Sequence, residues 1–475
     1  MKLSVRDLEK IPHREFRNRE ILARSAVKGV STDSRRTHSG DLFIALRGES
    51  FDGHRFVGAA FAAGAVAAVV EEGFDSTHFA GKPLICVTDT SLALGTLART
   101  YRDKFRIPFL AVGGSNGKTT TKEMIAKVLG EKYNVLSTEG NLNNHIGVPM
   151  TLFRLNRKHE VAVVEIGTNH PGEIAGLCRT LAPTHGVVTT IGREHLEFFG
   201  SLEGVAEEEG ELFRSLASRA GGMAIVSTDD PRVSLAARSL KRKLTYGFKS
   251  RSASVRGRNV MVDDQGRASF EFRSRAMKRW HGVHLMIAGK HNALNALSAA
   301  AAGIAFHVPP ARICSALESC GPVSRRMETV SIGGVTVLND TYNANPDSAI
   351  AALQTLASLR VPGKKIAVLA DMKELGSGAA EEHACLGKEA AALGLDYLLT
   401  HGKLAKHIHA AAGIPGALHY DQKNILAEYL AELLTPGDAV LIKGSRGMHM
   451  EDIIAFLKER LHEAGTARPG EKQSG

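Results

Sequence analysis

A lysine and two threonines follow a glycine-rich turn in the segment FLAVGGSNGKTT, residues 109–120. The segment reads as an apolar strand, a turn, and the first residues of a helix. Glycines allow several backbone N–H groups and a helix N-terminus to converge on one anion. Lys118 would reach the β- and γ-phosphates of a nucleotide, and Thr119 would offer a hydroxyl to Mg²⁺. The residues predicted to hold phosphate are Gly113, Gly114, Ser115, Asn116, Gly117, Lys118, Thr119 and Thr120.

One position departs from the common form of such a loop, which has a glycine five residues before Gly117 where this chain has Val112. A glycine-rich turn that binds nothing is the alternative interpretation. The lysine, both threonines and the apolar strand together favour phosphate binding.

Two further polar residues follow apolar segments that read as neighbouring strands. Glu165 lies at the end of the run 161–166, and His195 follows the run 186–191. The carboxyl ends of parallel strands meet at one sheet edge, where such folds bind ligands. A carboxylate there can hold Mg²⁺, which prefers oxygen ligands. A solvated acid and a packing histidine are the alternatives, because the chain has 20 histidines.

The elements that position these residues form three segments of a 475-residue chain, too long for one ordinary core. In residues 1–107, apolar strands near 41–46 and 65–70 flank a helix at 56–63. In residues 108–323, strand and helix alternation predicts a mostly parallel sheet, and the alternating pattern near 253–287 predicts an antiparallel appendage.

Residues 324–465 read as a Rossmann-like, doubly wound α/β unit. Its predicted strands are 364–370, 396–400 and 438–443, and its predicted helices are 346–359, 381–393 and 448–460. The polar tail 466–475 is predicted to be disordered. The fold class is therefore α/β with three domains.

Composition argues against several classes of protein. The net charge is +10, but the basic residues are interpreted as dispersed, and only 5% of residues are aromatic, with no stacking pattern, so the charge supports nucleic-acid binding only weakly. No apolar run approaches a membrane span, and residues 1–7 are too charged for a signal peptide. Five scattered cysteines form no metal spacing and are typical of a reduced, cytoplasmic protein.

The motifs resemble those of the Mur ligases, the ATP-dependent amide-bond-forming enzymes of peptidoglycan synthesis. Residues 114–120 are similar to the family's ATP-binding signature, and residues 141–149 to its next shared block. The resemblance implies ATP and Mg²⁺ as cofactors, with Thr119, Glu165 and His195 at the metal. It also places Asn292 and Asn295 at the adenine, and Arg326 and Asp340 at the nucleotide.

Later blocks resemble the family member that joins D-alanyl-D-alanine to a UDP-N-acetylmuramoyl-tripeptide: residues 340–348, 371–376 and 443–447. Residues 33–35, 40–48 and 52–54 look like the family's uridine-nucleotide-binding domain. Tyr342 and Asn343 are candidates for the dipeptide site, with hinge or packing residues as the alternative. The implied substrate-binding residues are Ser34, Arg35, Asn141, Asn143, Asn144, Tyr342, Asn343 and Asn345.

One position departs from the family pattern, in which a lysine stands 14 residues after the motif histidine and is carbamoylated to give a metal-binding carboxylate. This chain has Glu209 there. Glutamate supplies a carboxylate without modification, although its side chain is about 3–4 Å shorter. Glu209 is therefore predicted to bind the metal together with Thr119, Glu165 and His195. The predicted catalytic residues are Lys118, Glu165, His195 and Glu209. The alternative is that Glu209 is a solvated helix residue.

Three other functions compete with this prediction. The chain could be another ligase of the superfamily, a nucleotide-binding relative with impaired catalysis, or a basic nucleic-acid-binding ATPase. The residues 342–346 and the uridine-type segment argue against the first, and the retained site residues against the second. A monomer without nucleic-acid or integral membrane partners is expected. The third residue of the tripeptide and the base that deprotonates the amine are left open.

Overall fold

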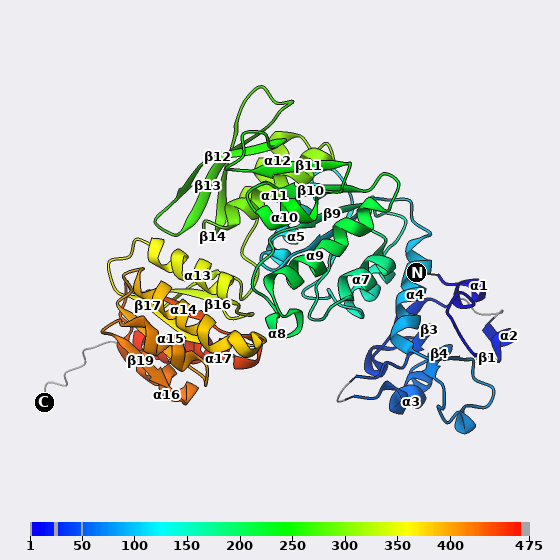
Figure 1. The fold of residues 1–475 in the computed structure, drawn as a ribbon. Coiled ribbons are helices and arrows are strands. Elements are labelled where there is room, and N and C mark those ends of the chain that lie inside the picture. The colour runs from blue at the N-terminus through cyan, green and yellow to red at the C-terminus, as the bar shows by residue number, and fades with distance from the viewer. Residues whose placement is uncertain (1, 23–26, 49–50, 467–475) are drawn as a thin grey trace, which may run out of the picture.

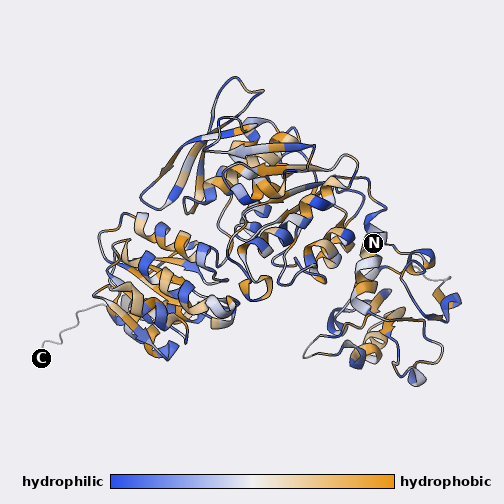
Figure 2. Ribbon diagram, in the orientation of Figure 1, coloured by the Kyte–Doolittle hydropathy of each residue, from blue (hydrophilic) through white to orange (hydrophobic). Residues whose placement is uncertain are grey.

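The computed structural model describes residues 2–22, 27–48 and 51–466, and it confirms an α/β protein of three domains, each built around its own sheet (Figure 1). The central strands are short apolar runs buried on both faces, as parallel sheets between helices require. Figure 2 shows the same arrangement by hydropathy, with apolar residues along the strands and polar residues on the outer helix faces.

The N-terminal sheet has the strand order β1-β5-β4-β3-β2, and only β1 runs antiparallel to its neighbour. Helix α4 (Thr90–Arg102) joins this domain to the next, because the Arg102 guanidinium donates hydrogen bonds to the carbonyls of Leu181 and Ala182 at 2.8 Å. The other elements are α1 (Val5–Leu8), β1 (Glu15–Arg17), α2 (Arg19–Leu22), β2 (Gly29–Ser31), β3 (Asp41–Ile44), α3 (Val57–Ala62), β4 (Ala67–Glu71) and β5 (Leu84–Val87).

The central sheet has nine strands in the order β14-β13-β12-β11-β10-β9-β6-β8-β7. All neighbours from β7 to β12 in this sheet order, β6 included, pair in parallel. The β12–β13 and β13–β14 pairs are antiparallel, which confirms the predicted appendage. Helices α5 and α11 pack against one another over this sheet. The strands are β6 (Phe109–Gly113), β7 (Val135–Ser137), β8 (Val161–Glu165), β9 (His185–Val188), β10 (Met223–Ser227), β11 (Lys243–Gly247), β12 (Val255–Val262), β13 (Arg267–Ser274) and β14 (His281–Ala288).

Helices of the central domain connect these strands and carry several of the predicted site residues. They are α5 (Lys118–Gly130), α6 (Gly147–Phe153), α7 (Glu173–Leu181), α8 (Leu196–Phe199), α9 (Leu202–Ala217), α10 (Pro231–Ala236), α11 (Asn292–Ala305) and α12 (Pro310–Glu318).

The C-terminal sheet has the order β15-β16-β20-β17-β18-β19, parallel except for the β15–β16 pair. The predicted strands and the first two predicted helices lie within two residues of the observed ones. The elements are β15 (Glu328–Ile332), β16 (Val335–Asp340), α13 (Pro346–Ser358), β17 (Lys365–Ala370), α14 (Ala379–Ala391), β18 (Tyr397–His401), α15 (Ala405–Ala412), β19 (Ala417–Tyr420), α16 (Lys423–Leu433), β20 (Ala439–Lys443) and α17 (Glu451–Thr466).

Strands β15, β16 and β19 and helices α15 and α16 were not predicted. Strands β15 and β19 lie at a sheet edge and are only partly buried, so they lack the continuous apolar run that marks β17 or β20. Strand β16 is an inner strand, but Thr336, Asn339 and Asp340 interrupt its apolar run. Helix α17 includes Thr466, the first residue of the predicted tail, and residues 467–475 lie outside the described part of the chain. Among the described helices, none has the length and apolar character needed to cross a membrane.

Candidate active site

The phosphate-loop prediction agrees with the local backbone. Gly114 and Gly117 have φ values of +113° and +79°, a region that favours glycine. A Cβ on Gly114 would lie 2.3 Å from the Thr189 Oγ1 atom, so the position has no room for a side chain. Gly117 precedes α5, and no described side chain caps that helix. The first N–H groups of α5 are therefore free to bind an anion.

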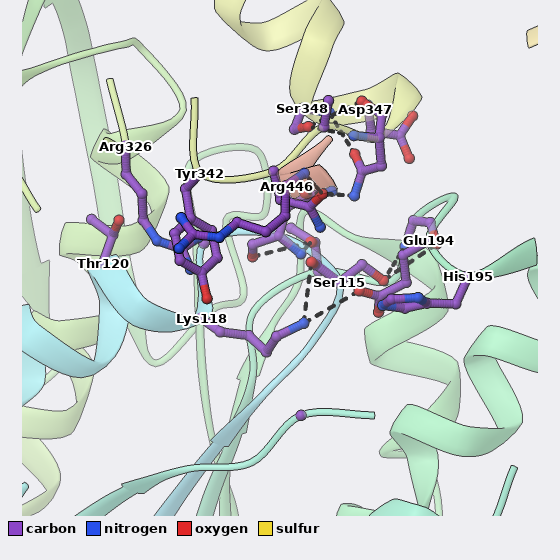
Figure 3. Close-up of a pocket in the computed structure, with 18 of the residues that line it drawn as sticks. Ser115, Lys118, Thr120, Glu194, His195, Arg326, Tyr342, Asp347, Ser348 and Arg446 are labelled. Atoms are coloured by element: carbon purple, nitrogen blue, oxygen red, sulfur yellow. Dashed lines mark hydrogen bonds and ion pairs between the residues drawn. The ribbon is translucent and has the colours of Figure 1, made fainter. Parts of the chain in front are cut away.

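Lys118 is the first residue of α5 and points into the space beside this loop (Figure 3). Its Nζ atom lies 3.3 Å from the Ser115 carbonyl oxygen and 3.3 Å from Glu194 Oε2. Burial alone would lower the pKa of the Lys118 ammonium, but the carboxylates of Glu194, Glu209 and Glu165 outweigh it and raise that pKa. Lys118 is therefore held in its charged form, as an ammonium group that neutralises phosphate must be.

Glu165 ends β8, and its backbone N–H donates to the hydroxyl of Thr138 at 3.0 Å. Its Oε1 atom accepts a hydrogen bond from Asn143 Nδ2 at 2.8 Å, whereas Oε2 is buried without a partner among the described residues. The Thr119 hydroxyl is likewise buried without a hydrogen-bond partner among the described residues. An unpaired buried oxygen is costly, so these two groups fit a ligand that completes them.

Glu209 lies directly behind the phosphate loop on α9. Its side chain is fully buried, and its Oε2 atom accepts a hydrogen bond from the Gly114 N–H at 2.7 Å. Burial, with the neighbouring Glu194 carboxylate, raises the pKa of the Glu209 carboxyl to about 8. Its Oε1 atom has no partner in the described part of the chain. The alternative of a solvated helix residue is therefore wrong.

The donor set fits Mg²⁺, although no three His, Cys, Asp or Glu side chains within the described ranges converge on one point. Mg²⁺ commonly keeps several waters and binds through one or two carboxylates plus substrate phosphates. Thr119, Glu165 and Glu209 each leave one buried oxygen unpaired beside the loop, and this is the oxygen-rich environment that such an ion requires.

His195 follows Glu194, the partner of Lys118, and faces the C-terminal domain. Its Nδ1 atom is 2.7 Å from Glu374 Oε2, although the ring is not aligned for a hydrogen bond. Both residues have left-handed backbones, with φ values of 47° and 64°. Non-glycine residues in this region are strained and cluster at functional sites. The pair brings two strained segments of different domains together.

Two loops of the central domain make further contacts with the C-terminal domain. The first is the loop before His195. Arg193 forms ion pairs with Asp347 at 2.6 Å and with Glu382 at 2.8 Å. On the phosphate loop, Asn116 Oδ1 accepts a hydrogen bond from Asn345 Nδ2 at 2.9 Å. Asn345 also caps α13, so this residue is committed to helix capping and to the interdomain contact.

Tyr342 is enclosed by two arginines at the lip of the C-terminal domain (Figure 3). The Arg326 guanidinium lies 3.9 Å from the ring centre and that of Arg446 lies 5.5 Å from it. Asp340 forms an ion pair with Lys443 at 2.6 Å, and Lys443 also donates to the Asn343 carbonyl. The lip therefore combines a flat aromatic ring with three cations.

The predicted asparagines lie around the same space. Asn292 and Asn295 are buried at the start of α11, where Asn295 Nδ2 donates to Asn292 Oδ1 at 2.9 Å. Asn144 caps the turn before α6 through the N–H groups of Ile146 and Gly147. Asn141 and Asn143 line the cavity beside Glu165.

Most of these groups border one cavity of about 970 Å³ between the central and C-terminal domains. Thr119, Arg193, Glu209 and Glu382 lie outside its lining. The structure does not bring Ser34 and Arg35 to it. They lie in a short 3₁₀ helix of the N-terminal domain, where Arg35 is mostly exposed and pairs with Asp33 at 2.8 Å. Figure 1 shows that this domain lies on the opposite side of the central domain from the C-terminal one.

Sequence reasoning missed Glu194, Glu374, Arg193 and Asp347. Glu194 stands beside His195 in the segment REH, and a second acid at a strand end was a signal that could have been used. The other three carry no such signal, because each acts through a partner on another domain.

Known proteins are similar to this chain over most of its length. The Mur ligase family catalytic domain matches residues 26–102, the Mur ligase middle domain residues 112–303, and the Mur ligase glutamate ligase domain residues 325–446. A UDP-N-acetylmuramoyl-tripeptide–D-alanyl-D-alanine ligase of Bacillus subtilis is 37% identical over 445 residues, covering 92% of this chain and 94% of that protein. The ligase of the same name from Escherichia coli is 36% identical and covers 90% of this chain and 93% of its own length.

Solved structures agree. MurF from Acinetobacter baumannii superposes with a TM-score of 0.88 at 33% identity, covering 97% of this chain and 99% of that one. The MurF ligase of Thermotoga maritima, solved in complex with ADP, has a TM-score of 0.82 at 28% identity and covers 92% and 99%.

The fold and the loop around Lys118 define a three-domain enzyme of the nucleotide-dependent ligase class. The chain belongs to the Mur ligase family.

Proposed function

We propose that this enzyme uses ATP to join D-alanyl-D-alanine to a UDP-N-acetylmuramoyl-tripeptide, releasing ADP and phosphate. The product is the UDP-muramoyl-pentapeptide of peptidoglycan synthesis. The observation that carries the proposal is the cavity itself: it is lined by Lys118, by the buried carboxylates of Glu165 and Glu194, and by the aromatic lip at Tyr342 from the other domain. The relatives that bear this activity in their names match more than nine-tenths of their own length.

The reaction needs an activated acid, because a carboxylate is a poor electrophile. The terminal carboxylate of the tripeptide attacks the γ-phosphorus of ATP in line, which forms an acyl phosphate and releases ADP. The amine of D-alanyl-D-alanine then attacks the acyl carbon, and phosphate leaves. Phosphoryl transfer of this kind depends on positioning and on cations that neutralise negative charge.

Lys118 supplies one such cation, and the helix N-terminus behind Gly117 supplies partial positive charge. Mg²⁺ would be held by Thr119, Glu165 and Glu209, with His195 at the border of the site, and would supply Lewis-acid stabilisation of the phosphate oxygens. Asn292 and Asn295 fit the adenine side of the nucleotide, and Arg326 and Asp340 the side presented by the C-terminal domain.

Residues 1–107, with Ser34 and Arg35, are proposed to hold the uridine diphosphate, and residues 324–465 to deliver the dipeptide through Tyr342 and Asn343. Asn141, Asn143 and Asn144, which line the cavity, are proposed to contact the substrate, and Asn143 donates a hydrogen bond to Glu165. Closing the C-terminal domain on the loop through Arg193 and Asn116 excludes water, which would otherwise hydrolyse the acyl phosphate. The active form is proposed to be a monomer.

Glu209 carries its own carboxylate, so we propose that activity is independent of carbon dioxide. Rates should be the same in rigorously degassed buffer and in buffer with added bicarbonate. The matched variant Glu209→Lys would need carbamoylation, and its activity should return only on addition of bicarbonate. A native enzyme that loses activity on degassing and recovers with bicarbonate would contradict this role for Glu209.

One assay tests the whole proposal. Purified enzyme is supplied with ATP, Mg²⁺ and UDP-N-acetylmuramoyl-tripeptide, with and without D-alanyl-D-alanine, and ADP and pentapeptide are quantified. Both should form together, and only when the dipeptide is present. Product with a single amino acid instead would indicate another ligase of the family, and ADP without a longer peptide would indicate impaired catalysis. Lysine- and diaminopimelate-containing tripeptides should be assayed side by side.

A further inference from the structure

The interpretation of the basic residues as dispersed is wrong: the net positive charge of this protein is concentrated in one part of the central domain. Residues 241–281 contain twelve Lys and Arg and only three Asp and Glu, which amounts to +9 of the chain's net charge of +10. The rest of the chain therefore has a net charge of only +1. The segment corresponds to β11, β12, β13 and the start of β14, at the antiparallel edge of the sheet.

Within this segment the charges gather at one end of the appendage. Residues 249–258 and 273–281 hold eight Lys and Arg and no Asp or Glu. Strand pairing places them together, since Arg256 is directly opposite Arg273 and the Arg275 side chain donates to the Ser252 carbonyl. We call this group the basic cluster: Lys249, Arg251, Arg256, Arg258, Arg273, Arg275, Lys278 and Arg279.

The basic cluster is a solvent-facing surface. Six of its eight residues are exposed, and Arg256 and Arg273 are half-buried. Among the described residues, only Arg258 forms an ion pair, with Glu271. The inner face of the same strands is buried in the core through residues such as Val255 and Phe272. In Figure 1 this end rises from the central domain at the top of the view, and its loops are hydrophilic in Figure 2.

Like charges placed opposite one another destabilise a strand pair, yet Arg256 stands directly opposite Arg273 in this one. The single tryptophan, Trp280, is half-buried between them and Arg258, with guanidinium groups 4.1 to 5.8 Å from its ring. The cavity between the domains is lined by other residues, so the ligase reaction does not account for these charges. An anionic partner outside the cavity would account for these charges.

We infer that the basic cluster binds the surface of an anionic lipid membrane peripherally. The charges lie on two loop tips and a strand end, and a flat anionic surface can contact all of these at once. Lysine and arginine near such a surface attract it, and tryptophan is favoured at the interface. A protein partner would need an apolar centre, and the exposed large apolar residues of this region, Met261 and Met286, lie outside the cluster.

A nucleic acid fits less well, because single strands need a free aromatic face on which bases stack. The Trp280 ring is instead occupied by guanidinium groups. Binding to a membrane surface goes beyond the proposed ligase function and does not depend on it.

The test is co-sedimentation of the full chain with vesicles of phosphatidylglycerol and phosphatidylcholine, compared with vesicles of phosphatidylcholine alone. Binding is expected only to the anionic vesicles. It should disappear in about 0.5 M NaCl, where the Debye length falls to about 4 Å.

The variant Arg275→Glu/Lys278→Glu/Arg279→Glu should lower the vesicle-binding constant at least 100-fold, since each basic residue near the surface contributes about fivefold. The matched control Lys388→Glu/Lys403→Glu/Lys458→Glu changes the net charge equally on exposed sites of the C-terminal domain and should retain binding. Both variants should keep the ligase activity measured in solution.

Three results would overturn the inference. They are no binding of the native chain to anionic vesicles, equal losses in both triple variants, or tighter binding to a single-stranded oligonucleotide than to the vesicles under the same conditions. Ligase activity measured without vesicles separates these failures from a failure of the proposed function.

Discussion

The two sides of the cavity are built in different ways. On the side of the central domain, Lys118, Glu194 and Glu209 have side chains 15%, 5% and 0% exposed, and their positions follow from neighbours within the same domain. At the border with the C-terminal domain, the contacts are ion pairs between domains. The side chains of Arg193 from the central domain and of Asp347 and Glu374 from the C-terminal domain are 30%, 36% and 45% exposed.

The difference separates two tasks. The buried side holds charge in a fixed geometry before any ligand arrives, which is what stabilisation of phosphate requires. The exposed side makes contacts that are individually weak in water and can break and reform, which is what domain closure around substrates requires. Changes on the buried side should therefore affect chemistry, and changes on the exposed side should affect assembly of the site.

The largest effect is expected for Lys118→Ala. Loss of this ammonium removes the charge held against the phosphates, and kcat should fall by about 10³-fold or more. Circular dichroism and thermal unfolding should remain native. Lys127→Ala, on the exposed face of the same helix, is the control and should leave kcat unchanged. Comparable rates for the two variants would contradict the role of Lys118.

A second effect follows from Glu209, whose carboxyl has a pKa raised to about 8 by burial. The folded state binds this proton more tightly than the unfolded state, where the usual value is 4.5. The free energy of unfolding should therefore fall as pH rises from about 4.5 to 8, by on the order of 5 kcal/mol, and then level off. Glu209→Gln should remove this fall in urea titrations without nucleotide, and identical pH slopes would refute the prediction.

On the exposed side, Arg193→Gln removes the ion pairs to Asp347 and Glu382. We expect kcat/KM for ligation to fall about tenfold, since a charge-assisted bidentate contact contributes about 1.5–3 kcal/mol and part of it is screened by water. Affinity for ATP should not change. Arg214→Gln, which breaks an ion pair within α9, is the control, and small-angle scattering should show a more open ensemble only for Arg193→Gln.

The smallest effect concerns Tyr342, which presents the face of its ring to Arg326 and Arg446. Tyr342→Phe keeps this face and should change KM for the dipeptide less than about twofold, whereas Tyr342→Ala should raise it about fivefold, since an exposed cation–π contact contributes about 0.5–1 kcal/mol. Equal KM values for the two variants would argue against a role of the ring face.

Local sequence was enough to predict the glycine-rich turn and the helix that starts at Lys118, because the residues that form them are consecutive. It also predicted β17, β18 and β20 of the C-terminal sheet, since β17 and β20 are continuous apolar runs, but not the inner strand β16. The half-buried edge strands β15 and β19 escaped prediction, because their burial depends on neighbours elsewhere in the chain.

Glu209 shows where sequence reasoning stops. Its position in the chain suggested a carboxylate near the metal, but a solvated acid in the run EEE was equally compatible with the letters. Only the packing of α9 behind β6 showed that the side chain is buried against Gly114.

By itself, the sequence determined the α/β class, the phosphate loop and the concentration of positive charge in residues 241–281, because these depend on residue types and short spacings. The tertiary structure alone decided that Glu194 holds Lys118, that Arg193 reaches Asp347 and that the basic residues lie together on one surface. The physical reason is distance along the chain: residues 76 and 154 positions apart meet only when whole domains pack, and no local pattern encodes such a contact.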